Sequence, residues 1–145
     1  MKTRHNIAIG DTTAERVKIN VGSALTELDE PPANYPVHGR DLMTGIPKEI
    51  VVTYKEIAAA MNNSIEQIEE AIMSALFKTP PELSADIYNT GLYLTGGGSM
   101  LRGLDKRISL KTKLPVYVAE DPLRAVARGT GIALKNIEKF PFLLK

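Results

Sequence analysis

Residues 91–136 alternate between strand-like and helix-like segments, and this order constrains the fold more than any other feature of the sequence. Short apolar runs bounded by glycine or proline predict strands, and longer stretches with helical periodicity predict helices. The expected order is a strand at 91–95, a helix at 99–108, a strand at 115–119 and a helix that Asp121 and Pro122 open and that runs to about residue 136. Two strands joined by a covering helix are typically parallel. This half of the chain is therefore expected to be a β-α-β-α unit of an α/β fold.

The earlier part of the chain predicts a small α+β unit. Residues 12–25 carry apolar side chains at helical spacing, although the VKINV segment within them also alternates as a strand does. The breaker-rich residues 28–36 predict a connector. Strands are expected at 37–40 and 48–53, with DLMTG supplying the turn of a hairpin.

A long helix follows the hairpin, and a capping box marks its start. Thr53 and Glu56 are three residues apart, so each side chain can satisfy a free backbone N–H of the first turn. One face of the helix then repeats apolar residues at spacings of three and four: Ile57, Met61, Ile65, Ile68, Ile72 and Leu76. This stripe predicts burial of one face over the whole helix.

The TPPE segment predicts the end of the long helix and the boundary between two subdomains. Thr79 and Glu82 match a second capping box, with Pro80 at the first position of a helix that runs to about Tyr88. We place residues 1–79 in the first subdomain and residues 80–145 in the second.

The composition excludes several classes of function. The 18 basic and 17 acidic residues nearly cancel, which argues against a nucleic-acid-binding face. Cysteine is absent and the two histidines, His5 and His38, show no spacing typical of a metal site. No apolar run approaches the roughly 20 residues of a membrane span, and no nucleophile–base pair stands out, so we assign no catalytic residue and no metal ligand.

The segment LTGGGSM is the first candidate binding site. Gly96, Gly97 and Gly98 follow a strand and precede Ser99, where a helix is expected. Consecutive glycines lose backbone entropy on folding, and they are tolerated where a ligand approaches the backbone or where a positive φ is required. A base can lie against such a ledge, with phosphates near the helix start. The alternative is a tight turn without a ligand.

The segment TAERVK is the second candidate. On a helix, Glu15 and Lys18 share one face, where a carboxylate can accept hydrogen bonds from ribose hydroxyls and an ammonium can lie over an adenine ring. Two simpler interpretations compete with this one. Thr12 and Glu15 also match a capping box, and Glu15 with Lys18 can be a solvated ion pair.

Taken together, the segments IGDTTAERVKINVGSA, VHGRDLMTGIPKEI, KTPPELSADIYNTGLYLTGGGSMLRGLDKRI and LPVYVAEDPLRAVARGTGIAL resemble MreB, the rod-shape-determining bacterial actin family. The resemblance implies an actin/Hsp70-type ATPase fold, of which this chain is subdomain IIB followed by the second portion of subdomain IIA. It also implies that adenosine of ATP or ADP is clasped between two sets of residues: Glu15, Arg16, Val17 and Lys18 on one side, and Gly96, Gly97, Gly98 and Ser99 on the other.

The resemblance also sets expectations for activity and partners. The family's phosphate loops and catalytic acidic residue lie upstream, so we expect a fragment that does not hydrolyse ATP alone and whose full-length parent uses Mg²⁺. The parent is expected to polymerise into cytoplasmic filaments at the membrane periphery, where it organises cell-wall synthesis and maintains rod shape. Apolar residues of the hairpin region are expected to contribute to filament contacts: Tyr35, Leu42, Met43 and Ile46. Half of an actin-fold chaperone or sugar kinase, or an interaction module without a ligand, are the alternatives.

Overall fold

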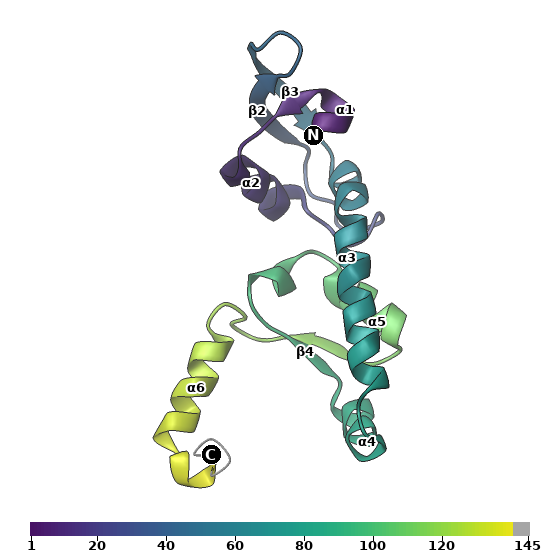
Figure 1. Cartoon of the computed structure of the whole chain (residues 1–145), viewed down its shortest axis with the longest axis vertical. Coiled ribbons are helices and arrows are strands. Elements are labelled where there is room, and N and C mark those ends of the chain that lie inside the picture. The colour runs from purple at the N-terminus through teal and green to yellow at the C-terminus, as the bar shows by residue number, and fades with distance from the viewer. Residues whose placement is uncertain (141–145) are drawn as a thin grey trace.

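One long helix runs alongside two separate sheets in the computed structural model, which describes residues 1–140 (Figure 1). The helix is α3 (Tyr54–Phe77). The first sheet is antiparallel, in the order β1 (Ile7–Ala8), β2 (Tyr35–Asp41) and β3 (Pro47–Val52). The second sheet is the parallel pair β4 (Leu92–Leu94) and β5 (Val116–Val118). We call residues 1–22 and 35–61 the hairpin lobe and residues 62–140 the glycine lobe, with residues 23–34 connecting α2 to β2.

Five buried aliphatic side chains form the core cluster of the hairpin lobe. They come from α2 (Asp11–Val21), β2, β3 and the start of α3: Val17, Val21, Val37, Val52 and Ile57. Each such side chain contributes about 1.5–3 kcal/mol when fully buried. The segment expected at 12–25 forms a helix rather than a strand. This helix runs from Asp11 to Val21 and ends before Gly22, which adopts an extended backbone. A short α1 (Lys2–His5) precedes β1 and reaches α3 through the hydrogen bond between His5 Nε2 and Glu56 Oε1 (3.1 Å).

Hydrogen bonds between near neighbours fix both ends of the hairpin region. At its tip, Asp41 Oδ1 accepts from the backbone N–H groups of Met43 (2.8 Å) and Thr44 (3.1 Å), and Lys48 pairs with Oδ2 at 3.0 Å. The bond from the Lys48 ammonium, followed by those two backbone bonds, lowers the pKa of Asp41 to about 2. At the other end, the expected capping box of Thr53 and Glu56 is formed, with bonds of 3.3 and 3.0 Å.

The glycine lobe packs on the second half of α3. Its core consists of four buried residues, two of them on α5 (Leu104–Thr112): Ala24, Ile65, Leu104 and Ile108. The predicted parallel pair is present, with Leu92 opposite Val116 and Leu94 opposite Val118. The remaining helices are α4 (Pro81–Thr90), η1 (Gly97–Met100), α6 (Ala125–Lys135) and η2 (Ile137–Lys139). In Figure 1, α6 extends away from the rest of the glycine lobe and from the hairpin lobe.

Three further predictions of helix starts or lengths are wrong. The helix expected at 99–108 is two pieces, since Gly103 adopts a left-handed backbone (φ 74°) between η1 and α5. The second capping box does not form, because Thr79 Oγ1 donates to Ala75 O at the end of α3 and α4 begins at Pro81. The last helix begins at Ala125 rather than after Asp121, because the Pro122 carbonyl accepts from Gly96 N at 2.7 Å.

The buried face of α3 also differs from the predicted stripe. Ile57 and Ile65 are buried as expected, but Ile68 is exposed and its neighbour Glu69 is buried instead. A carboxylate at a core position requires a partner. The partner is Arg107, which lies on α5 and is described below. Residues 141–145 of the expected second subdomain lie outside the described residues.

Candidate nucleotide-binding site

Four residues of the second candidate segment, Glu15, Arg16, Val17 and Lys18, lie on the middle of α2. Val17 is buried in the hairpin-lobe core, whereas Glu15, Arg16 and Lys18 are exposed. Glu15 Oε2 and Lys18 Nζ form an ion pair of 2.7 Å, and about half of each side chain is in contact with solvent. Such a pair contributes little to stability, so both groups can turn to a ligand at small cost. Because the helix begins at Asp11 with Gly10 as its N-cap, the alternative capping box of Thr12 and Glu15 is not formed.

A depression of about 450 Å³ lies between α2 and α3. Glu15, Val17 and Lys18 line it from α2, and Ile57 and Met61 line it from α3. Its walls combine apolar side chains with two carboxylates, those of Asp11 and Glu15, and the Lys18 ammonium. Apolar walls with a few polar groups are the general make-up of a small-molecule site. The glycines of the first candidate segment do not line this depression.

The glycine turn exposes its backbone. Gly96 has a positive φ of 78°, which favours glycine, and a Cβ placed on Gly96 or Gly98 would meet no atom within 4 Å. Ser99 is buried, and its hydroxyl donates to Gly96 O at 2.7 Å, so this side chain supports the turn from inside. The turn leads into the short η1 rather than into a long helix, so the expected helix-dipole contribution at this point is weak.

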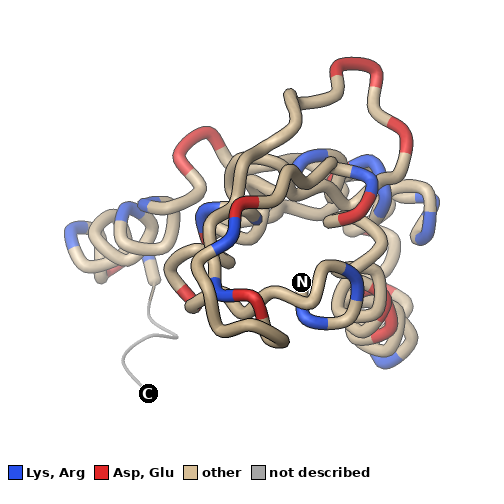
Figure 2. The backbone as a smooth tube through the Cα atoms, turned by 90° about the horizontal axis from the view of Figure 1, so that it is seen from above, with Lys and Arg blue, Asp and Glu red and all other residues tan. Residues whose placement is uncertain are grey.

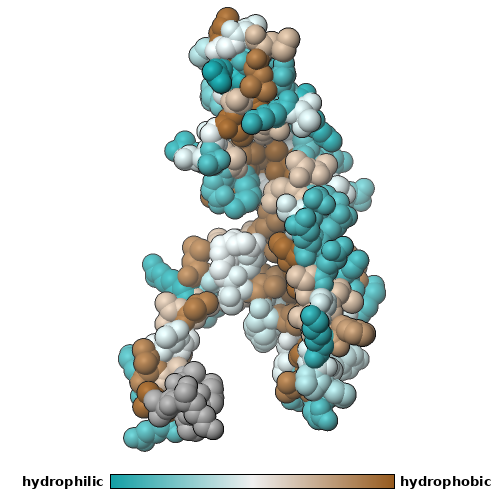
Figure 3. All heavy atoms as spheres, viewed as in Figure 1, coloured by the Kyte–Doolittle hydropathy of each residue, from teal (hydrophilic) through white to brown (hydrophobic). Residues whose placement is uncertain are grey.

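Both candidate segments lie on the same side of α3, one in each lobe (Figure 1). Figure 3 shows the surface hollowed between the lobes on that side. The connection between them is direct: Ser23, just after α2, pairs with Arg102, just after η1, in an isolated parallel bridge, and Ala24 N donates to Arg102 O at 2.8 Å.

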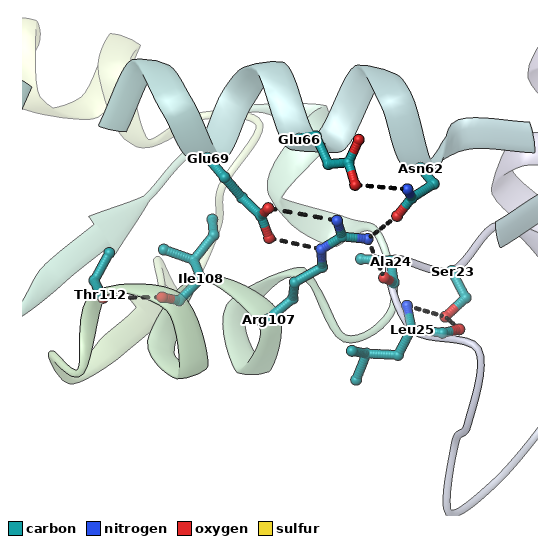
Figure 4. Close-up of polar contacts among 9 residues, drawn as sticks. All are labelled: Ser23, Ala24, Leu25, Asn62, Glu66, Glu69, Arg107, Ile108 and Thr112. Carbon is teal, nitrogen blue, oxygen red and sulfur yellow. Dashed lines mark hydrogen bonds and ion pairs between the residues drawn. The ribbon is translucent and has the colours of Figure 1, made fainter. Parts of the chain in front are cut away.

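The largely buried guanidinium of Arg107 also supports this junction (Figure 4). Arg107 donates from Nε to Glu69 Oε1 at 2.6 Å and from Nη1 to the Ala24 carbonyl at 3.0 Å and to Asn62 Oδ1 at 2.8 Å. One side chain of α5 thus ties the segment after α2 to the middle of α3. Neither Arg107 nor Arg102 was predicted to matter, because their partners are far away in the sequence and no local pattern marks them.

Charge and metal chemistry give no further site within residues 1–140. Figure 2 shows basic and acidic residues interspersed along the backbone. Among the described residues, no group of three or more His, Cys, Asp or Glu side chains is arranged to hold a metal ion. Likewise, no helix in that part of the chain is long and apolar enough to cross a membrane.

The arrangement of the two lobes matches solved structures of actin-like proteins. MreB5 of Spiroplasma citri bound to ADP superposes with a TM-score of 0.88 at 37% identity, covering 95% of this chain and 41% of that one. The same protein bound to AMPPNP gives 0.88 at 35% identity, covering 99% and 43%. The double helical filament of MamK gives 0.64 at 23% identity, covering 84% and 37%, a likeness of fold alone. The chain therefore has part of an actin-like fold, as expected.

Sequence comparison narrows this class to one family. The MreB/Mbl protein family model matches residues 1–141. The cell shape-determining protein Mbl of Bacillus subtilis is 41% identical over 141 residues, which is 97% of this chain and 42% of Mbl. MreB of Escherichia coli is 41% identical over 138 residues, or 95% and 39%. The chain belongs to the MreB/Mbl family, and it spans about two fifths of the length of these relatives.

Proposed function

We propose that this chain clasps the adenosine of ATP or ADP as part of an actin-like cytoskeletal protein. Glu15 accepts from the ribose hydroxyls, Lys18 lies over the adenine ring, and Gly96–Gly98 form the ledge on which the base rests. The observation that carries this proposal is the direct backbone connection between the end of α2 and the loop after the glycine turn, which keeps both segments on one side of α3. The ADP and AMPPNP bound to the two MreB5 structures support it.

Gly98→Val is the sharpest test of the ledge. The new side chain meets no protein atom within 4 Å of its Cβ, so it blocks the ledge and leaves the fold intact. Gly129→Val is the matched control, because Gly129 on α6 is equally open. By titration calorimetry or ligand-detected NMR we expect the wild-type chain to bind ADP with a dissociation constant on the order of 1 mM, since the phosphates stay in water. Gly98→Val and Lys18→Ala are expected to weaken binding, and ADP affinity equal to wild type in Gly98→Val contradicts the proposal.

Phosphoryl transfer belongs to the full-length parent in this proposal. Hydrolysis requires Mg²⁺, a phosphate cradle and a positioned water, and the loops expected to supply them lie upstream in the family. The 145-residue chain is therefore expected to show no ATP turnover. Turnover that is lost on mutation of a residue within this chain contradicts that expectation.

We propose that filament contacts form at the two ends of the long axis of this part of the molecule. Leu42, Met43 and Ile46 are exposed at the hairpin tip, and Phe77 is 92% exposed at the turn between α3 and α4, at the opposite end (Figure 1). Two different apolar surfaces at opposite ends suit a head-to-tail, heterologous contact. Tyr35 does not belong to this patch, since it is half-buried against the hairpin-lobe core.

Replacing Leu42 and Met43 together by Asp is expected to block pelleting of the full-length protein with ATP. Leu110→Asp on α5 is the control, as an exposed leucine away from both ends. In cells, the same double variant is expected to turn membrane-peripheral filaments into diffuse cytoplasmic fluorescence, and rod-shaped cells into round ones, because ordered cell-wall synthesis is lost. Normal filaments from a well-folded double variant contradict the proposal.

A further inference from the structure

The segment after α2 and the loop after the glycine turn pack so closely that neither can shift alone. We call this contact, between residues 22–25 and 101–103, the seam. A Cβ on Gly22 would lie 3.1 Å from Leu101 Cδ1, and one on Gly103 would lie 2.8 Å from Leu25 Cδ1. Each glycine thus receives a leucine from the other segment, which leaves the seam close-packed.

The backbone of Arg102 holds the first side of the seam. Its carbonyl accepts from Ala24 N at 2.8 Å and from Ser23 Oγ at 3.3 Å. Ser23 is fully buried, and its hydroxyl also donates to Leu25 O at 2.7 Å. The short segment after α2 is therefore anchored to one residue of the facing loop.

The side chain of Arg102 then reaches back to α2 itself. Nη1 donates to Ile19 O at 3.1 Å and to Gly22 O at 3.4 Å. Carbonyls in the last turn of a helix lack intrahelical partners and carry the negative end of the helix dipole, so a guanidinium is well suited to them. Backbone and side chain of one residue thus hold the C-terminal end of α2 from two directions.

We infer that Arg102 is a positioning residue that sets the separation between the two adenosine-clasping segments. Ile19 directly follows Lys18, and Arg102 follows shortly after Ser99, so the guanidinium joins the segments near the point where each ends. The identity of the ligand rests on the function proposed above. The spacing role does not depend on the ligand and can be measured without it.

The absence of cysteine permits a direct distance measurement on the 145-residue chain. Thr12→Cys on α2 and Met100→Cys on η1, both exposed, carry nitroxide labels whose separation is read by pulsed electron resonance. We expect one narrow distance in the chain with Arg102. Arg102→Ala is expected to broaden or shift that distance, and Arg102→Lys is expected to restore it in part, because an ammonium can still donate to a carbonyl. Arg124→Ala, at an exposed arginine outside the seam, is the control and is expected to change nothing.

ADP titration of the unlabelled variants completes the test. Arg102→Ala is expected to weaken ADP binding roughly tenfold, the size of one charged hydrogen bond. An unchanged distance distribution in Arg102→Ala overturns the inference. If that variant does not fold by circular dichroism, an unchanged distance in Arg102→Met, which keeps the aliphatic stem and has no N–H donor, overturns it. A broadened distance with unchanged ADP affinity shows that the separation of the two segments does not affect nucleotide binding, and this result also overturns the inference. A broadened distance in a chain whose wild type binds no ADP overturns the proposed function and leaves the spacing role standing.

Discussion

The two lobes share one helix but are stabilised in different ways. The core cluster of the hairpin lobe has five buried aliphatic residues, and hydrogen bonds between near neighbours fix its turn and the start of α3. The glycine lobe has a smaller core, to which the segment between α2 and β2 contributes Ala24, and it relies on Arg107 and Arg102 reaching residues distant in the sequence. Local interactions therefore define the first lobe, and long-range polar contacts define how the second is attached to it.

Removing Arg107 is expected to have the largest effect on this difference. Arg107→Ala leaves Glu69, whose side chain is only 8% exposed, without its cation. The loss of one partner of a buried pair lowers the free energy of unfolding by about 3 kcal/mol. Lys106→Ala removes the adjacent, exposed pair with Asp29 and is expected to leave the urea midpoint unchanged.

A double variant separates the cost of an orphaned charge from the value of the contact. With Arg107→Met and Glu69→Leu together, no charge is left unpaired, and most of the lost stability is expected to return. If the double variant is as unstable as Arg107→Ala, the buried pair itself attaches the glycine lobe and apolar packing cannot replace it.

Thr53→Ala tests the local side of the comparison, with an intermediate effect. The capping box loses its bond to the Glu56 N–H, which is expected to cost about 1 kcal/mol in urea unfolding. Thr53→Ser keeps a hydroxyl and is expected to retain most of the stability. A loss as large as that of Arg107→Ala would show that the hairpin lobe depends on this single cap as strongly as the glycine lobe depends on its long-range pair.

The smallest expected effect is the acid titration of the hairpin tip. The Lys48 ammonium lowers the pKa of Asp41 from 3.8 to about 2, so the stabilising contribution of the ionised carboxylate is present above pH 3.8 and is lost as the pH falls through about 2. The amide NMR signals of Met43 and Thr44 are expected to shift with that midpoint. Lys48→Met moves the midpoint upward, and Asp41→Asn abolishes the transition. A midpoint near 3.8 in the wild type contradicts the observed contacts.

The same contrast explains what the sequence could predict. The capping box at Thr53 and the DLMTG turn depend on residues close together in the chain, and the parallel pair follows from the order strand, helix, strand. All three predictions are confirmed. The burial of Glu69 was not predictable, because its partner Arg107 lies on another helix. The start of α6 was predicted too early in the chain, because Gly96 N donates a hydrogen bond to the Pro122 carbonyl from another part of the lobe.

The candidate site divides along similar lines. Sequence and family resemblance identified Glu15, Lys18 and the glycines, whose binding role stays a prediction. The features that hold these segments together were not visible. Gly22 and Gly103 fall inside the helices expected at 12–25 and 99–108, and only the structure shows a leucine packed against each of them.

The uninterrupted passage of α3 through both cores has a consequence for synthesis on the ribosome. The first core can form as soon as Ile57 has been synthesised, because its other members precede Ile57 in the chain. Ile65 can be buried only after Leu104 and Ile108 have been synthesised. During that interval the second half of α3 presents its apolar face to solvent. The whole helix, of 24 residues, is about 36 Å long. Its second half is where a chaperone is expected to bind the nascent chain.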